Sequence, residues 1–204
     1  MIYLASRSPR RLELLAQLGI ECRLLLDDDA ARAEALEHPI AGEAPAAYVL
    51  RVATAKARAA LTRLAGSGLP RAPILAADTT VALGGTLFGK PLDRTDARRM
   101  LERLSGRTHR VLTAVVVADT AGKRLHAATQ ISRVRFARLR AAELADYVAS
   151  GEPDGKAGGY AIQGRAAAFV RRIEGSYSGI MGLPLHETAH LLRRAGYTGP
   201  ASGR

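Results

Sequence analysis

The first residues of the chain that can do chemistry are a serine and three arginines that follow an apolar strand. Ser6-Arg7-Ser8-Pro9-Arg10-Arg11 comes directly after Ile2-Tyr3-Leu4-Ala5, and a helical pattern of leucines then runs to Gly19. Ser8 suits the N-cap of that helix and Pro9 its first position. Because free backbone N–H groups at a helix N-terminus attract anions, the arginines beside them predict a phosphate site. A basic surface turn beside a capped helix is the alternative.

A carboxylate and a lysine follow in the middle of the chain. Asp78 comes after the apolar run 74–77, so we expect it at the C-terminal end of a strand, where α/β folds bind ligands. An aspartate there can take a proton from water or hold a divalent metal, although a turn-capping aspartate is the simpler interpretation. Lys90 lies between Gly89 and Pro91, and because proline fixes the backbone, this lysine should be presented from a stiff strand end.

Two further polar side chains are candidates for ligand contacts. His109 enters an apolar strand, where a structural histidine is the more common interpretation than a catalytic one. Gln163 lies in a glycine-rich segment, residues 151–164, whose backbone could approach a ligand closely. Its amide carries both donors and an acceptor and therefore suits the edge of a base, with a plain flexible loop as the alternative.

The elements that must position these side chains alternate between helices and strands. Helices are predicted over residues 44–65, 93–104, 141–149 and 184–195, and strands over 22–26, 81–83, 86–88, 108–118 and 125–137. Early βαβ character followed by a long antiparallel ribbon predicts an α/β fold, a twisted mixed sheet flanked by helices with a central cleft. We expect one domain over residues 1–195, with two lobes around the cleft as one arrangement, and a C-terminal tail over 196–204.

Composition limits the class of protein. The chain has 204 residues and is 48% hydrophobic, which argues against disorder. No apolar stretch is long enough to span a membrane, and no secretory signal is recognisable, so a cytoplasmic protein is expected. The single cysteine, Cys22, excludes an internal disulfide and a cysteine-based zinc cluster, and we expect it to be a packed thiol at the start of the second strand.

The net charge of +11 raises the question of nucleic-acid binding. Basic residues are scattered along the chain with no long run, and with three Phe, six Tyr and no Trp there are few side chains for base stacking. We therefore expect no dedicated binding of nucleic acid, and a small polyanionic substrate instead.

Six short motifs, in this order, give the chain a specific resemblance. They span Ser6 to Arg11, Ala77 to Thr79, Gly89 to Pro91, Ser105 to Val111, Lys156 to Gly164 and Gly175 to Pro184. Each motif is weak alone, but together they resemble the Maf family of nucleoside triphosphate pyrophosphatases, relatives of the Ham1-like (inosine triphosphatase) fold. The matching stretches run from Leu4 to Leu192 and so cover nearly the whole chain.

The resemblance implies an activity and a set of site residues. The family hydrolyses the bond between the α- and β-phosphates of nucleoside triphosphates, with the help of a divalent cation, Mg²⁺ or Mn²⁺. It implies Asp78 as the group that activates water. The implied triphosphate site comprises Ser6, Arg10, Arg11, Lys56 and Lys90. The subgroup that acts on dTTP and UTP carries Arg, Thr and Gln at its specificity positions, and Arg10, Thr79 and Gln163 match it here, whereas a subgroup preferring methylated GTP differs there.

One departure from the family pattern concerns the metal. Family members often carry an acidic residue, usually Glu, shortly after the second strand, and counting from Gly19 places Ala31 near that position. Asp28, Asp29 and Glu34 are substitutes between which the sequence does not choose.

The resemblance predicts a pyrophosphatase of dTTP and UTP that removes surplus or unwanted nucleotides. The same reaction on modified nucleotides is one alternative, and a nucleotide- or nucleic-acid-binding regulator of cell division is another. The oligomeric state stays open, with a homodimer as one option.

Overall fold

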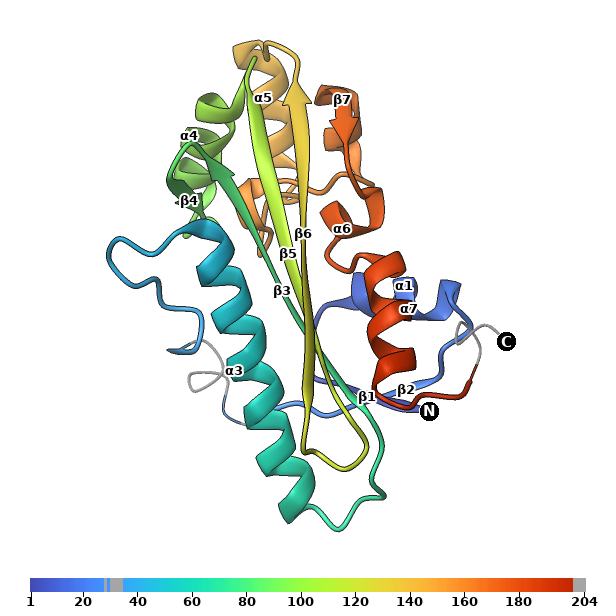
Figure 1. Cartoon of the computed structure of the whole chain (residues 1–204). Helices are drawn as coiled ribbons and strands as arrows, with labels where there is room; N and C mark the ends of the chain where they lie inside the picture. The colour runs from blue at the N-terminus through green and yellow to red at the C-terminus, as the bar shows by residue number, and fades with distance from the viewer. Residues whose placement is uncertain (28, 30–34, 200–204) are drawn as a thin grey trace.

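Parallel pairing is confined, in the residues that the structure describes, to the first strand and its two neighbours (Figure 1). The computed structural model describes residues 1–27, 29 and 35–199. In these, a seven-stranded sheet has the order β2-β1-β3-β5-β6-β7, with β4 paired to β3. The strands are β1 (Ile2–Leu4), β2 (Cys22–Leu24), β3 (Ile74–Leu83), β4 (Thr86–Phe88), β5 (Thr108–Ala118), β6 (Leu125–Phe136) and β7 (Val170–Glu174). The expected βαβ start followed by a long antiparallel ribbon is confirmed.

Helices cover both faces of this sheet (Figure 1). The α-helices are α1 (Pro9–Gln17), α3 (Pro45–Gly66), α4 (Arg94–Leu104), α5 (Ala141–Ala149), α6 (Tyr177–Met181) and α7 (Leu185–Arg194), and the 3₁₀ helices are η1 (Ala157–Gly159) and η2 (Arg165–Phe169). Helix α3 runs along one face, and α1 and α7 pack on the other. The mixed α/β fold class is therefore confirmed.

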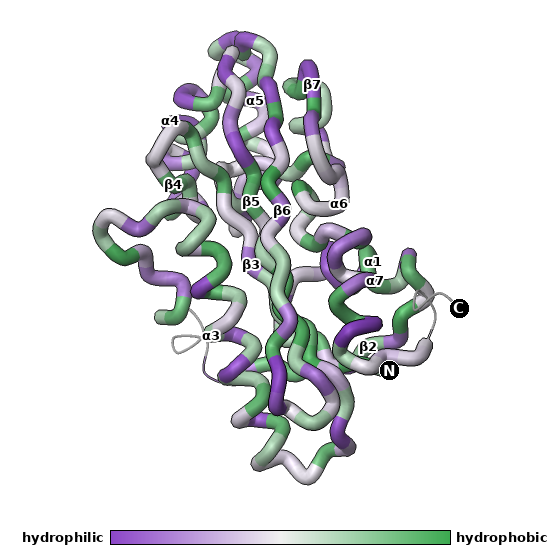
Figure 2. The backbone as a smooth tube through the Cα atoms, in the orientation of Figure 1, coloured by the Kyte–Doolittle hydropathy of each residue, from purple (hydrophilic) through white to green (hydrophobic). Residues whose placement is uncertain are grey.

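The period of two in the central strands sorts their side chains between these helices. Ala76 and Val116 pack with Val49 and Ala53 of α3. One residue along each strand, Leu75, Ala77, Val115 and Val117 face the opposite way and pack with Leu15 of α1 and Leu191 of α7. Because both faces are covered there, the runs 74–77 of β3 and 114–118 of β5 are apolar throughout, and Figure 2 shows the hydrophobic colour in the lower part of the two strands.

The expectation that Asp78 ends a strand is wrong. Strand β3 continues through it to Leu83, since the β-branched Thr79 and Thr80 favour extended backbone and the strand pairs with β5 over this whole stretch. The strand that ends near Asp78 is β1, the parallel neighbour of β3. Leu4, the last residue of β1, pairs with Leu75, so Asp78 lies three residues beyond the carboxyl end of β1. The loop that follows β1 can therefore lie against it.

Most element boundaries agree with expectation, and four features differ. The long strands and α5 fall where predicted, but β2 ends at Leu24 and is shorter than expected. Ser8 stands at the N-cap of α1 without using its side chain there. Strand β7 and helix α6 were not predicted. Among the described residues, no helix is long and apolar enough to cross a membrane.

Candidate active site

A cavity of about 650 Å³ opens beside the middle of β3 and is bounded by segments far apart in the sequence. It is lined by the loop between β1 and α1, by α3, by the segment after β4 and by the glycine-rich stretch before η2. All eight side chains that the family resemblance implies for the site line it: Ser6, Arg10, Arg11, Lys56, Asp78, Thr79, Lys90 and Gln163. The volume is in the range of small-molecule and cofactor sites.

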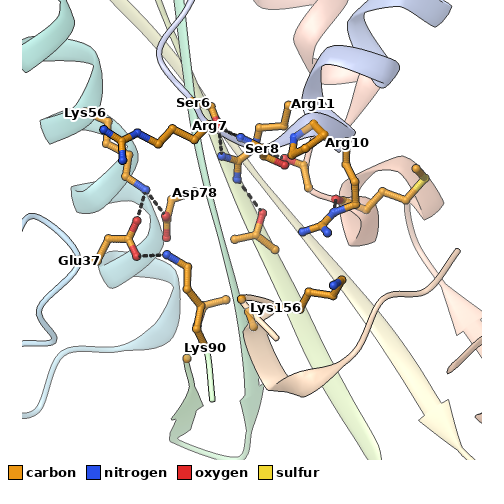
Figure 3. Close-up of a pocket in the computed structure, with 18 of the residues that line it drawn as sticks. Ser6, Arg7, Ser8, Arg10, Arg11, Glu37, Lys56, Asp78, Lys90 and Lys156 are labelled. Carbon is orange, nitrogen blue, oxygen red and sulfur yellow. Dashed lines mark hydrogen bonds and ion pairs between the residues drawn. The ribbon is translucent and has the colours of Figure 1, made fainter. Parts of the chain in front are cut away.

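Asp78 is the carboxylate at the floor of this cavity. Its side chain is 9% exposed, and its Oδ1 accepts a hydrogen bond of 2.8 Å from Nζ of Lys56 on α3 (Figure 3). Burial raises the pKa of Asp78 above its ordinary value, because the charged form loses its hydration, and Lys56 and Arg11 oppose this effect. A carboxylate with a raised pKa next to a cavity is suited to accept a proton.

A second carboxylate, Glu37, meets the same lysine. Nζ of Lys56 lies 2.7 Å from Oε1 of Glu37, and Nζ of Lys90 lies 2.9 Å from its Oε2. Burial disfavours the charged form of Glu37, but Lys56 and Lys90 together outweigh it and hold the pKa of Glu37 below its usual value. Asp78, Lys56, Glu37 and Lys90 thus form a row of alternating charge across the cavity (Figure 3).

Helix α3 also fixes the backbone that carries Glu37. Oη of Tyr48 donates a hydrogen bond of 2.8 Å to the carbonyl of Glu37, and Arg51 donates one of 2.9 Å to the carbonyl of His38. The guanidinium of Arg51 is itself held by both carboxylate oxygens of Glu43, at 2.7 and 2.8 Å. A side chain outside regular structure is therefore presented to the cavity by a clamp built on one helix.

Glu37 is a further acidic residue at the cavity, and it was not among the candidates that the sequence offered. Of the substitutes considered there, Asp28 and Glu34 lie outside the described residues, as does Ala31, and Asp29 does not line the cavity. Residues 36–44, which carry Glu37, lie outside helices and strands, and such segments tolerate insertions, so counting residues from Gly19 could not locate the acid. The usable signal was spatial, namely the two lysines that Glu37 reaches.

Arg10 and Arg11, in the first turn of α1, are held in place by carbonyls of residues 181 and 182. Arg11 is buried, and its Nη1 donates to Oγ of Ser6 at 2.8 Å, its Nη2 to Oγ1 of Thr79 at 3.2 Å and its Nε to the carbonyl of Gly182 at 2.8 Å. Arg10 reaches the carbonyl of Met181 at 3.3 Å. Burial lowers the pKa of Arg11, and Asp78 opposes that change. The predicted anion site therefore has a guanidinium in a fixed position at its base.

The glycine-rich stretch before η2 brings Gln163 to the wall of the cavity. Gln163 is exposed, and the next residue, Gly164, has no room for a side chain, because a Cβ there would overlap the carboxylate of Glu152. That carboxylate accepts from Oη of Tyr147 at 3.1 Å and from the backbone N–H of Arg165 at 3.0 Å. The loop that carries Gln163 is thus anchored to α5.

His109 does not belong to this site. It lies in the core beside Phe136, with Nε2 2.8 Å from Oη of Tyr160, and it does not line the cavity. Burial lowers its pKa to about 4, so the ring is neutral near pH 7. These contacts support the structural interpretation of His109. Cys22 starts β2 as expected and is half-buried against the core.

Comparisons with known proteins agree with the resemblance that the sequence motifs indicate. A family model described as "Maf-like protein" matches residues 1–195. The chain is 63% identical to a dTTP/UTP pyrophosphatase of Cupriavidus pinatubonensis over 194 residues, which is 95% of this chain and 96% of that protein. It is 59% identical to a dTTP/UTP pyrophosphatase of Ralstonia nicotianae over 197 residues, 97% of this chain and 95% of that protein. The solved structure of the Ham1 protein of Staphylococcus aureus is similar over 66% of this chain and 71% of its own, with a TM-score of 0.39 and 10% identity.

Proposed function

This chain belongs to the Maf family, and we propose that it hydrolyses dTTP and UTP to the corresponding nucleoside monophosphate and pyrophosphate. One observation carries the proposal. The buried Asp78 lies in a cavity that is lined by cationic side chains, namely Lys56, Lys90, Arg10 and Arg11. A binding module would need the cations but not a carboxylate of raised pKa among them.

Asp78 takes the role of base. Water adds to phosphorus, the anhydride bond between the α- and β-phosphates breaks, and pyrophosphate leaves with the electron pair of that bond. One proton of the water passes to Asp78, whose Oδ1 is fixed by Lys56. The raised pKa of Asp78 favours this transfer, since a stronger base accepts the proton more readily.

The cationic side chains bind and neutralise the triphosphate. Phosphoryl transfer depends mainly on positioning and on stabilising oxygen charge, because little covalent chemistry is required of the protein. Arg10 and Arg11 come from the N-terminal turn of α1, and Lys90 comes from the opposite side of the cavity. The arginines and the lysine would therefore neutralise the phosphate oxygens from two sides.

The donor set also fits a divalent cation. Asp78 and Glu37 each place a carboxylate oxygen within 2.8 Å of the same atom, Nζ of Lys56, so both acids reach one small region. Two carboxylates completed by waters and substrate phosphates are a usual environment for Mg²⁺, and Mn²⁺ accepts the same oxygen ligands. When bound, the cation would polarise the phosphate oxygens and assist ionisation of water. We propose Glu37 and Asp78 as its protein ligands.

Gln163 is proposed to read the base. It lines the same cavity as the arginines but comes from a separate segment of the chain, the glycine-rich stretch before η2. An amide pairs with the alternating donors and acceptors of a uracil or thymine ring. A site built for one such edge disfavours a base that leaves those groups unpaired.

The test is a panel of canonical and modified nucleoside triphosphates with Mg²⁺ or Mn²⁺, with products separated by ion exchange. UMP and pyrophosphate from UTP are expected, with dTTP and UTP preferred over ATP and GTP. UDP with inorganic phosphate as the main products would refute the reaction, and a modified nucleotide as the best substrate would refute the specificity. Action in the cytoplasm and a homodimer remain predictions.

A further inference from the structure

We propose that Thr113, which does not line the cavity, is a positioning residue that fixes Arg11 through the hydroxyl of Thr79. The inference rests on the proposed function, since it assigns Arg11 to the triphosphate of that same site. Thr113 lies on β5 directly opposite Thr79 on β3, and its side chain is buried. Three hydrogen bonds link Arg11 through these threonines to the backbone of α6.

The direction of each hydrogen bond in this chain is determined. Thr113 donates to the carbonyl of Gly179 at 2.7 Å, and a hydroxyl has only one proton to give. Its contact of 2.9 Å with Thr79 must therefore be donated by Thr79. Thr79 in turn accepts from Nη2 of Arg11 at 3.2 Å, because a guanidinium can only donate. The sequence of donors is Arg11 to Thr79 to Thr113 to Gly179.

This order restricts what Thr79 can do. Its one proton is committed to Thr113, so it cannot donate a hydrogen bond to a base or a phosphate while the chain is intact. Thr79 matches a specificity position of the dTTP and UTP subgroup, yet its observed contacts are with Arg11 and Thr113. Its contribution to the site is therefore to orient Arg11.

The arginine keeps donors for a ligand. Three of its five N–H groups meet Ser6, Thr79 and the carbonyl of Gly182, and the other two have no partner within the described part of the chain. The bonds that fix the guanidinium plane thus leave one N–H on each terminal nitrogen for phosphate oxygen. A pre-organised guanidinium binds phosphate with less loss of side-chain entropy than a mobile one.

The same chain of hydrogen bonds explains one sequence motif to which the reaction alone assigns no role. Gly179 and Gly182, from the motif Gly175 to Pro184, supply the carbonyls that end the chain and hold Nε of Arg11. Gly182 has φ +122°, a conformation that favours glycine, and a Cβ there would lie 3.6 Å from Oγ1 of Thr79. The backbone around α6 therefore serves as the fixed support for a side chain of α1.

The experiment compares Thr113→Val with Thr113→Ser. Valine keeps the shape but removes the hydroxyl, whereas serine keeps the hydroxyl, and Thr108→Val at the exposed start of β5 is the matched control. We expect Thr113→Val to raise the KM for UTP about tenfold while kcat changes less than about threefold, the scale of one displaced charge-assisted hydrogen bond. Thr113→Ser should restore KM to within about twofold, and the preference for UTP over GTP should not change in any variant.

A second readout does not depend on activity. In ¹⁵N-labelled protein, the Nε–H of Arg11 should exchange slowly with solvent, faster in Thr113→Val, and slowly again in Thr113→Ser. Unchanged exchange and KM in a folded Thr113→Val variant would overturn the proposal, as would a serine variant no better than valine. A fall in the UTP to GTP ratio would show that Thr79 contacts the base. If the wild type hydrolyses no nucleotide, the proposed function fails, and the exchange rates alone then decide whether Thr113 fixes Arg11.

Discussion

Nζ of Lys56 lies 2.8 Å from Oδ1 of Asp78, yet the pKa of that carboxylate is raised. Burial therefore outweighs the attraction of the lysine, which holds the carboxylate in place without cancelling its basicity. Nζ of Lys56 also lies 2.7 Å from Oε1 of Glu37, so its positive charge is shared between the two carboxylates. Asp78, the proposed base, is thus held in a fixed position while its pKa stays raised.

We predict that Asp78→Asn keeps the fold but lowers turnover of UTP by about two orders of magnitude or more, the scale of losing a general base or metal ligand. The asparagine has nearly the same shape, and Lys56 keeps its bond to Glu37. Pyrophosphate release measures the effect, and Asp146→Asn on the exposed surface of α5 is the control. Turnover near the wild-type value in a folded variant would make Asp78 a structural residue.

Glu37→Gln distinguishes two roles of this carboxylate: binding the metal ion, or competing with phosphate for Lys56 and Lys90. If Glu37 helps hold the cation, the Mg²⁺ concentration for half-maximal activity should rise about tenfold, because an oxygen ligand of full charge is lost. Glu102→Gln, which changes an exposed ion pair of α4, should leave it unchanged. An unchanged requirement for Mg²⁺ together with a lower KM for UTP would mean that Glu37 instead occupies Lys56 and Lys90 in place of phosphate.

The buried ring of His109 should make stability depend on pH. Its pKa is about 4 in the folded protein and near 6.5 in an unfolded chain, so the unfolded state takes up the proton first as pH falls. The stability from a neutral His109 is complete above about pH 6.5 and is lost as pH falls toward 4. We expect about 2 kcal/mol of this loss between pH 7 and pH 5. Urea unfolding at both pH values should show a smaller difference for His109→Gln, and equal differences would contradict the assignment.

The parts of the site that follow strong local patterns could be predicted from the sequence. The turn from β1 into α1 carries its own signals in Pro9 and the leucines, and two long strand patterns joined by a short turn predicted the ribbon of β5 and β6. Asp78 was placed at a strand end because apolar runs on either side of it looked like two strands. The β-branched threonines between them, and pairing with β5, make one.

What could not be predicted depends on contacts between distant segments. Glu37 is placed by Tyr48 and Arg51 across an irregular stretch with no periodicity to read. Helix α6 has five residues, too short for a periodic signal, and its role appears only when its carbonyls meet Arg11 and Thr113. Local sequence supplied the reactive groups, and the supports that orient them became visible only in three dimensions.

The last prediction concerns base choice, which the proposed function assigns to Gln163. Gln163→Glu replaces the amide donor by a charged acceptor at nearly constant shape, so a carbonyl of uracil would face a carboxylate. Because the buried supports of Arg11 and Asp78 are untouched, kcat for UTP should change less than the ratio of kcat/KM for UTP to that for GTP. We expect this ratio to fall about tenfold or more, as for a lost hydrogen bond in a reading site. Gln17→Glu, exposed at the end of α1, is the control for added charge. A wild-type ratio near one, or a ratio that the substitution leaves unchanged, would place the base-reading contact elsewhere in the cavity. A parallel loss of turnover on every nucleotide would instead assign Gln163 to the phosphates, since an interaction common to all substrates cannot select among them.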